Sequence, residues 1–159
     1  MSAKIVDFGP KKIAGYKISC SMDDGKIADF WKEIFDDGRH KKLHEADFFA
    51  SHDEYGVCKM TGETTMDYII GREVKEAALV PSEFTIVDLP KGDYLYITTN
   101  PSDRESFATS IQKGWQDFHV EIEKLEYTFA SYLSFELYSE KNMSDSSYTC
   151  EIYAEVTKK

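Results

Sequence analysis

Residues 15–35, GYKISCSMDDGKIADFWKEIF, decide the fold because they join an extended segment to an amphipathic helix. The extended part follows Gly15, and the helical part covers residues 23–35. Five large apolar residues of the helical part recur at helical spacing: Ile27, Phe30, Trp31, Ile34 and Phe35. This spacing places them on one face of the helix. The segment therefore predicts a strand followed by a helix that buries a single face.

A second stretch of the chain repeats this layout. Residues 92–99, GDYLYITT, form another extended segment after a glycine, and a helix is predicted from Ser102 to Phe118. Ser102 and Glu105 have the spacing of a capping box, which marks the start of a helix. Two further extended segments follow each helix: residues 47–55 and 65–70 in the first half, and residues 131–138 and 148–156 in the second. The two halves can thus be laid over each other, with Gly15 on Gly92.

This order of elements predicts an internal duplication. Each half reads as a β-α-β-β unit, the first over residues 4–75 and the second over residues 84–157, with residues 84–89 as an added strand. The fold class is then α+β, with an antiparallel sheet and two main helices on one face. We expect one domain over residues 1–159 and a ligand cleft where the two repeats meet.

The composition is both acidic and aromatic. The 159 residues carry 19 Lys and Arg against 29 Asp and Glu, a net charge of −10, together with 10 Phe, 10 Tyr and 2 Trp. Nucleic acids and anionic lipids both attract basic patches, which this balance does not favour. We therefore expect no direct nucleic-acid binding and no membrane binding, and we interpret most of the carboxylates as solvated surface.

The cysteines and the N-terminal sequence bear on the compartment. Cys20, Cys58 and Cys150 have no CxxC or other metal-ligand spacing. The N-terminus has no basic region followed by a long apolar stretch, and no apolar run approaches the roughly 20 residues that span a bilayer. We expect a cytoplasmic protein with reduced thiols.

The strand at residues 131–138 has two faces of different character. Because side chains alternate along a strand, Leu133, Phe135 and Leu137 share an apolar face. Glu136 and Tyr138 belong to the other face. The last strand divides in the same way, with Tyr153 on its more polar side. Alternation alone leaves open whether the face of Glu136 meets solvent or a cleft.

Three short motifs resemble one known family. They are residues 135–138 (FELY), residues 150–156 (CEIYAEV) and residues 89–94 (LPKGDY). Together with the helix at residues 102–118, they resemble the GyrI-like domains, the effector-binding domains of AraC- and MerR-type bacterial transcription activators. The resemblance covers residues 12–156. The chain departs from the family at Glu155, where many members carry a proline, and around residues 48–62.

The resemblance implies a fold of two SHS2-like β-α-β-β repeats with a ligand cleft between them. In the family a buried glutamate of the FExY strand meets lipophilic cations, and Glu136 occupies that position here. Tyr138 and Tyr153 match the aromatic residues of the last two strands, and Trp115 and Tyr16 are assigned to the binding site by their elements. A desolvated carboxylate is costly unless a cation pairs with it, and aromatic faces attract the same cation. Trp115 also completes an apolar helix stripe, which is typical of core packing.

Several functions follow from this resemblance. The first is a stand-alone module that senses or sequesters a lipophilic, cationic small molecule. The chain begins almost at the first predicted strand, so we expect no helix-turn-helix domain before it. The second is a hydrolase of strained, cyclopropane-type electrophiles, in which Glu136 acts as a general base with Tyr138 or Tyr153. The third is a gyrase-inhibitor-like module that binds a protein partner.

The histidines give no clear sign of a metal centre. His40 and His44 stand at i and i+4, next to Glu45, and would share one face of a helix. They lie in a basic stretch, residues 40–44 (HKKLH), and no HExxH motif is present. No P-loop, GxGxxG or GxSxG motif occurs either. We therefore expect neither a metal nor a cofactor.

Overall fold

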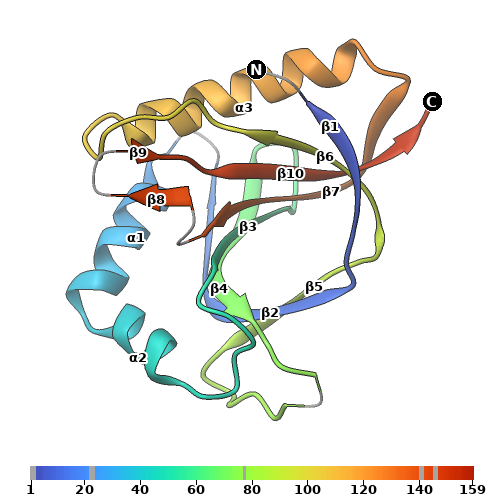
Figure 1. Ribbon diagram of the computed structural model, residues 1–159. Helices are drawn as coiled ribbons and strands as arrows, with labels where there is room; N and C mark the ends of the chain where they lie inside the picture. The colour runs from blue at the N-terminus through green and yellow to red at the C-terminus, as the bar shows by residue number, and fades with distance from the viewer. Residues whose placement is uncertain (1–2, 22–23, 77, 140–141, 145–146) are drawn as a thin grey trace.

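The computed structural model describes residues 3–21, 24–76, 78–139, 142–144 and 147–159 of the chain. Strands dominate it, and three helices accompany them (Figure 1). The elements in chain order are β1 (Lys4–Phe8), β2 (Lys11–Ser21), α1 (Lys26–Asp36), α2 (Arg39–Glu45), β3 (Glu54–Met60), β4 (Thr65–Glu73), β5 (Thr85–Leu89), β6 (Gly92–Thr98), α3 (Phe107–Glu123), β7 (Tyr127–Tyr138), β8 (Met143–Ser144), β9 (Ser147–Tyr148) and β10 (Glu151–Lys158).

The sheet topology confirms the predicted duplication. Eight strands form one antiparallel sheet in the order β1-β6-β10-β7-β3-β4-β2-β5, and β8 and β9 form a separate two-stranded sheet within the described residues. Exchanging β1 with β5, β2 with β6, β3 with β7 and β4 with β10 turns this order into its own reverse. The two halves are therefore related by a pseudo-twofold arrangement whose centre lies between β3 and β7. The first strand of each half pairs with a strand of the other half: β1 pairs with β6, and β5 pairs with β2.

The helices cover one face of the sheet, and each half has its own core beneath them. Phe30 and Ile34 of α1 pack with Leu43 of α2 over the first half, and Phe118 and Ile122 of α3 pack over the second. A third cluster of apolar side chains fills the opposite face: Ile13, Tyr55, Val57, Ile69, Val87, Leu89, Tyr94, Leu133, Phe135, Leu137 and Tyr153. In Figure 1, α3 runs along the top of the sheet and α1 and α2 along its left side. The α+β class with an antiparallel sheet is thus confirmed.

Two local predictions need correction. The strand predicted at residues 47–55 is β3, which runs from Glu54 to Met60, because α2 and the segment after it occupy the preceding residues. The second helix begins at Phe107, after the N-cap Ser106, and not at Ser102. The Ser102 hydroxyl donates to the carbonyl of Asp103, and the backbone of Ser102 pairs with Tyr148, so it belongs to a β-bridge instead of a helix cap. A capping-box motif predicts a helix start only where no such pairing competes for the same backbone groups.

The departure at Glu155 coincides with an irregularity in the sheet. Ala154 of β10 pairs with Ser134 of β7, whereas Val156 pairs with Phe129, so the extra residues of this bulge lie in β7 and not at Glu155. On its other side, Glu155 keeps its regular pairing with Tyr94 of β6.

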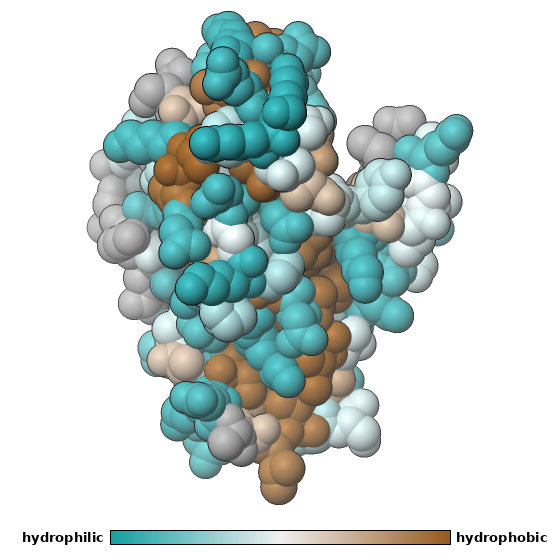
Figure 2. Space-filling view, turned by 90° about the vertical axis from the view of Figure 1, so that its right-hand side faces the viewer, coloured by the Kyte–Doolittle hydropathy of each residue, from teal (hydrophilic) through white to brown (hydrophobic). Residues whose placement is uncertain are grey.

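The surface combines hydrophilic areas with an apolar band. Figure 2 shows hydrophilic residues over the upper part of one face and apolar residues joined from its centre to its lower end. Large apolar side chains are exposed at six described positions: Phe35, Leu79, Ile86, Val120, Phe129 and Tyr132. Within the described residues, no helix has the length and apolar character that crossing a membrane requires.

Candidate functional site

Glu136 is a buried carboxylate that accepts three side-chain hydrogen bonds. Its side chain points to the helix-covered face of β7, and the residue is only 8% exposed. Its Oε1 accepts from the hydroxyls of Tyr68 (3.0 Å) and Tyr138 (2.9 Å). Its Oε2 accepts from the indole Nε1 of Trp115 (2.8 Å). The acid thus lies at the meeting point of β4, β7 and α3, where the two halves of the duplication join.

Both tryptophans of the chain donate into this network. Trp115 of α3 reaches Glu136 directly, and Trp31 of α1 donates its Nε1 to the Tyr68 hydroxyl at 2.9 Å. The Tyr68 hydroxyl in turn donates a hydrogen bond to Glu136, so one indole from each half is connected to the same carboxylate, directly or through Tyr68. The apolar stripe of each helix orients these rings towards the sheet. The site is therefore built by the contact of the two repeats.

A glycine makes room for the pair of Tyr68 and Glu136. Gly56 of β3 lies opposite Glu136 in the ladder with β7. A Cβ at this position would be 2.2 Å from the Tyr68 hydroxyl oxygen and 3.0 Å from Glu136 Oε1. Any side chain here would displace both groups, since real Cβ atoms do not approach so closely. The close approach of backbone and side chains explains the glycine.

Burial and hydrogen bonding act on Glu136 in opposite directions. Burial raises its pKa because the charged form loses its hydration, and the hydrogen bonds from Trp115, Tyr138 and Tyr68 lower it again. Burial prevails, so the pKa lies above its ordinary value of 4.5. Burial, together with the nearby charge of Glu136, also raises the pKa of Tyr68 and of Tyr138 well above the ordinary value. Both phenols consequently stay protonated and remain donors.

The walls around the carboxylate are aromatic. The ring of Trp31 meets that of Tyr138 edge-on at 5.3 Å between centroids, and the ring of Phe107 meets Tyr138 edge-on at 6.1 Å. Phe107 in turn packs on Tyr148 at 5.5 Å. No Lys, Arg or His among the described residues forms an ion pair with Glu136. A buried acid thus faces π-systems and neutral donors instead of a cationic side chain.

The structure brings two of the predicted companions to Glu136 and places the other two elsewhere. Tyr138 and Trp115 donate to its carboxylate. Tyr153 lies on the opposite face of the sheet, because it pairs with Phe135 while Ile152 pairs with Glu136. There it stacks on Phe135 and donates to Glu151.

Tyr16 belongs to the core of the first half. Its ring packs on Phe84 at 5.3 Å, and the guanidinium of Arg39 lies over it at 5.5 Å. Its hydroxyl is buried and has no hydrogen-bond partner among the described residues. Burial raises the pKa of this phenol, with Glu83 adding to the shift. None of its described contacts reaches Glu136.

Three members of the site were not predicted from the sequence: Tyr68, Gly56 and Trp31. Trp31 was identified only as part of a helix stripe, although its counterpart Trp115 occupies the same place in the second half. The paired tryptophans were the signal that could have identified it. Tyr68 and Gly56 carry no motif, and they reach Glu136 only through the pairing of β3 with β4 and β7.

Comparison with known proteins gives the family. The family model of Cass2, integron-associated effector binding protein, matches residues 4–156. No curated protein sequence matches the chain significantly. Among solved structures, SAV2435 bound to tetraphenylphosphonium superposes with a TM-score of 0.80 at 19% identity, covering 99% of this chain and 94% of that one.

Two further structures share the fold at low identity. The integron cassette protein VCH_CASS2 of Vibrio cholerae has a TM-score of 0.64 at 15% identity and covers 98% of this chain and 95% of that one. The EcmrR C-terminal domain has a TM-score of 0.67 at 13% identity, with 99% and 98% covered. The predicted resemblance is confirmed: the chain belongs to the Cass2 family of integron-associated effector-binding proteins and has the GyrI-like fold.

Proposed function

We propose that this protein binds a lipophilic organic cation, with Glu136 as its counter-ion, and thereby senses or sequesters that compound. The observation that carries the proposal is a buried carboxylate that has no cationic partner among the described residues, accepts from Trp115 directly and is connected to Trp31 through Tyr68. Membership of an effector-binding family supports small-molecule binding in general. The cationic and lipophilic character of the ligand rests on the chemistry of the site.

The charge argument begins with the cost of burying an acid. An ionised carboxylate in an apolar environment is unfavourable unless a counter-charge compensates it. Three neutral donors compensate Glu136 in part, but its pKa stays above 4.5. A ligand cation near the carboxylate would favour the ionised form, and a neutral analogue would not. The site therefore selects for positive charge.

The aromatic walls favour an apolar surface around that charge. Trp31, Trp115, Tyr138 and Phe107 offer rings from three different elements. Each ring face attracts a cation by on the order of 0.5–2 kcal/mol, and apolar contact adds to this. A similar structure, SAV2435, is bound to tetraphenylphosphonium, which combines a positive centre with aromatic arms. This relative supports the same ligand class here.

Access to the carboxylate requires the rings to move. Glu136 is almost fully covered, and a surface hollow with a volume of about 360 Å³ lies elsewhere. That hollow is lined by Asp29, Lys32, Glu33 and Asp36 of α1 and by Asp37, which follows the helix. Rotation of Trp31 or Phe107 would open the path, since Trp31 is half-buried and its one described hydrogen bond is to Tyr68. When the ligand enters, contacts between the aromatic side chains are then replaced by contacts between these side chains and the cation.

The contacts of Glu136 favour binding over hydrolysis. A general base has to reach the water that it activates, whereas three hydrogen-bond donors already take three of the roughly four acceptor positions of the Glu136 carboxylate. Burial also raises the pKa of the thiols of Cys20, Cys58 and Cys150, so these cysteines are not activated nucleophiles. The described residues of the site are thus better suited to binding a cation than to catalysing hydrolysis.

The test measures the affinity for tetraphenylphosphonium by isothermal titration calorimetry, with neutral triphenylphosphine oxide as the comparison ligand. Glu136→Gln should weaken binding of the cation by at least about tenfold and leave the neutral ligand unaffected. A loss of about 1.4 kcal/mol corresponds to each factor of ten. The matched control is Glu151→Gln, because Glu151 is an equally buried acid on the neighbouring strand but on the opposite face.

Equal weakening in both variants, or none in Glu136→Gln, would overturn the assignment of the counter-ion. Glu136→Gln keeps two acceptor bonds to Tyr68 and Tyr138 but presents an amide N–H to Trp115, so its fold has to be checked by thermal denaturation. If it is unstable, Tyr138→Phe and Trp31→Phe provide a second test. Both variants should lower the affinity for the cation without changing the charge.

A further inference from the structure

We propose that the protein also binds a divalent transition-metal ion through His40, His44 and Glu54, at a site separate from Glu136. His40 Nε2 and His44 Nε2 both approach Glu54 Oε1, the latter at 2.8 Å. The three potential ligand atoms all lie within 4.8 Å of one another. The three side chains are partly buried, with exposed fractions of 20%, 27% and 18%. Three potential ligands thus converge on one point at the surface.

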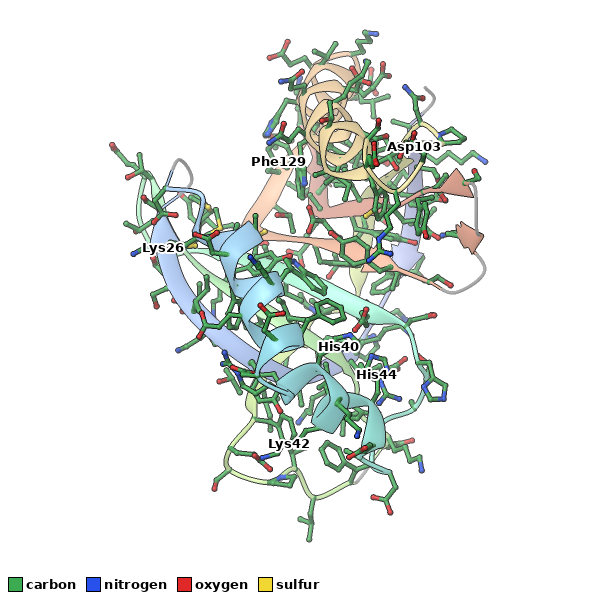
Figure 3. All side chains as sticks on the ribbon, turned by 90° about the vertical axis from the view of Figure 1, so that its left-hand side faces the viewer. Lys26, His40, Lys42, His44, Asp103 and Phe129 are labelled. Atoms are coloured by element: carbon green, nitrogen blue, oxygen red, sulfur yellow. The ribbon has the colours of Figure 1, made fainter. Side chains whose placement is uncertain are left out.

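Helical spacing accounts for the two histidines. The helix α2 begins after Gly38, whose φ of +87° suits glycine. Positions 40 and 44 are one turn apart, so their rings lie on the same side at 4.6 Å between centroids. Figure 3 shows His40 and His44 together on the side of α2 next to β3, while Lys42 lies on the other side. Lys42 is therefore directed away from the histidine pair.

The third ligand comes from a different element. Glu54 is the first residue of β3 and pairs with Tyr138 of β7, so its side chain lies on the helix-covered face of the sheet. This places the carboxylate beside α2. Eight residues separate the end of α2 from Glu54, which is why the sequence pattern around His40 did not reveal it. The site depends on how the chain returns from α2 to the sheet.

A buried arginine holds this return segment in place. Arg72 of β4 donates from Nη1 to the carbonyl of Leu43 (2.6 Å) and from Nε and Nη2 to the carbonyl of Ser51 (2.9 and 2.6 Å). Its guanidinium also lies over the ring of Phe49 at 4.5 Å. One side chain thus fixes the last turn of α2 and the segment before Glu54. Fixed ligand positions reduce the entropy lost when a metal binds.

The ligand set defines the class of metal. Two imidazole nitrogens and one carboxylate oxygen suit Zn²⁺, Co²⁺ or Fe²⁺, whereas Ca²⁺ and Mg²⁺ prefer oxygen ligands alone. Tetrahedral zinc with bonds of about 2.0–2.2 Å keeps its ligand atoms about 3.4 Å apart. The spacing found here requires only small side-chain rotations. Three protein ligands would leave a coordination position for water or another small molecule.

Ring contacts fix the orientation of His40 and connect the histidine group to the first site. His40 stacks on Phe35 at 3.9 Å, Phe35 stacks on Trp31 at 6.4 Å, and Trp31 donates to Tyr68. The side chain of Phe35 is itself largely exposed, so its ring is held mainly by these neighbours. A metal at His40 would immobilise this row of rings next to the wall of the Glu136 site.

The test uses tag-free protein, metal-depleted with EDTA and then dialysed. Addition of Co²⁺ should give visible d–d absorption that saturates at one ion per chain, and addition of Zn²⁺ should abolish the band. Glu54→Gln and His44→Asn should each weaken Zn²⁺ binding in calorimetry by at least about tenfold. His119→Asn is the matched control, because His119 lies on α3 against Phe118 and Phe129.

The outcomes separate a metal site from a simple ion pair. If Glu54 and the histidines only pair with each other, Co²⁺ gives no saturable band and Zn²⁺ binds the variants as it binds the wild type. Either result would overturn the proposal. Should His44→Asn not fold, NMR of the wild type answers the same question. Co²⁺ should then broaden the ring signals of His40 and His44 at one equivalent and spare those of His119.

Discussion

Replacement of Gly56 by alanine tests most sharply how the Glu136 site is assembled. The added Cβ would be 2.2 Å from the Tyr68 hydroxyl oxygen and 2.9 Å from its Cζ. Because carbon and oxygen need more than about 3 Å, the tyrosine ring has to move by about 1 Å. Two hydrogen bonds depend on its position, one donated to Glu136 at 3.0 Å and one accepted from Trp31 at 2.9 Å.

The expected magnitude follows from these contacts. Overpacking a filled site costs about 1–3 kcal/mol, and loss of a buried hydrogen bond adds about 1–3 kcal/mol. We therefore expect Gly56→Ala to lower the free energy of unfolding by about 2–6 kcal/mol. For a chain of this length, each kcal/mol lowers the melting temperature by about 2–4 °C. Binding of tetraphenylphosphonium should weaken as well, since the donors around Glu136 are displaced.

The assay is urea and thermal denaturation followed by tryptophan fluorescence. Gly92→Ala is the matched control, because a Cβ on Gly92 meets nothing within 4 Å, and the change should be within about 0.5 kcal/mol. In the double variant Gly56→Ala with Tyr68→Phe the clash is smaller, so the two losses should not add. If Gly56→Ala is as stable as the wild type and binds the cation equally well, the proposed packing of Gly56 against Tyr68 and Glu136 is wrong.

Three further predictions concern the charge and the hydrogen bonds. Burial raises the pKa of Glu136 above 4.5, so its stabilising contribution is complete below pH 4.5 and is lost as pH rises through the raised pKa. Compared with that of Glu136→Gln, the free energy of unfolding of the wild type should fall over this range by about 1.4 kcal/mol for each unit by which the pKa is raised. Urea denaturation at successive pH values measures this difference. Trp115→Phe removes the donor to Glu136 Oε2, so the protein should lose about 1–3 kcal/mol in the same assay, and the pH dependence should move to higher pH. Arg72→Lys cannot reproduce the bonds to Leu43 and Ser51, and we expect a loss of about 2–4 kcal/mol in thermal denaturation.

Local patterns predicted the two main helices and most of the strands, but not α2, and they placed the strand after the first helix at residues 47–55 instead of 54–60. The stripe of Phe30 and Ile34 is buried beneath α1, as helical spacing predicts. Element order alone suggested the duplication, and the reversed strand order confirms it. Alternation separated Phe135 from Glu136 correctly, but it could not say which face of β7 the helices cover. That choice depends on the register of the neighbouring strands.

Register also explains what the sequence could not provide. Tyr153 was matched to the ligand site by motif, yet its pairing with Phe135 puts it on the far face from Glu136. Tyr68 carries no motif and reaches Glu136 across a separation of 68 residues. His40 and Glu54 meet in the same way, through the return of the chain from α2 to β3. Contacts of this kind are properties of tertiary structure, and local periodicity does not contain them.

The central claim is that Glu136 is the counter-ion of a bound cation. A crystal structure of the protein with tetraphenylphosphonium tests it most directly. We expect the phosphorus centre beside the Glu136 carboxylate, with the phenyl arms against Trp31 and Trp115 and at least one ring rotated from its present position. A cation found instead in the acidic hollow of α1 at Asp29 and Asp36, with the Glu136 network unchanged, would contradict the account.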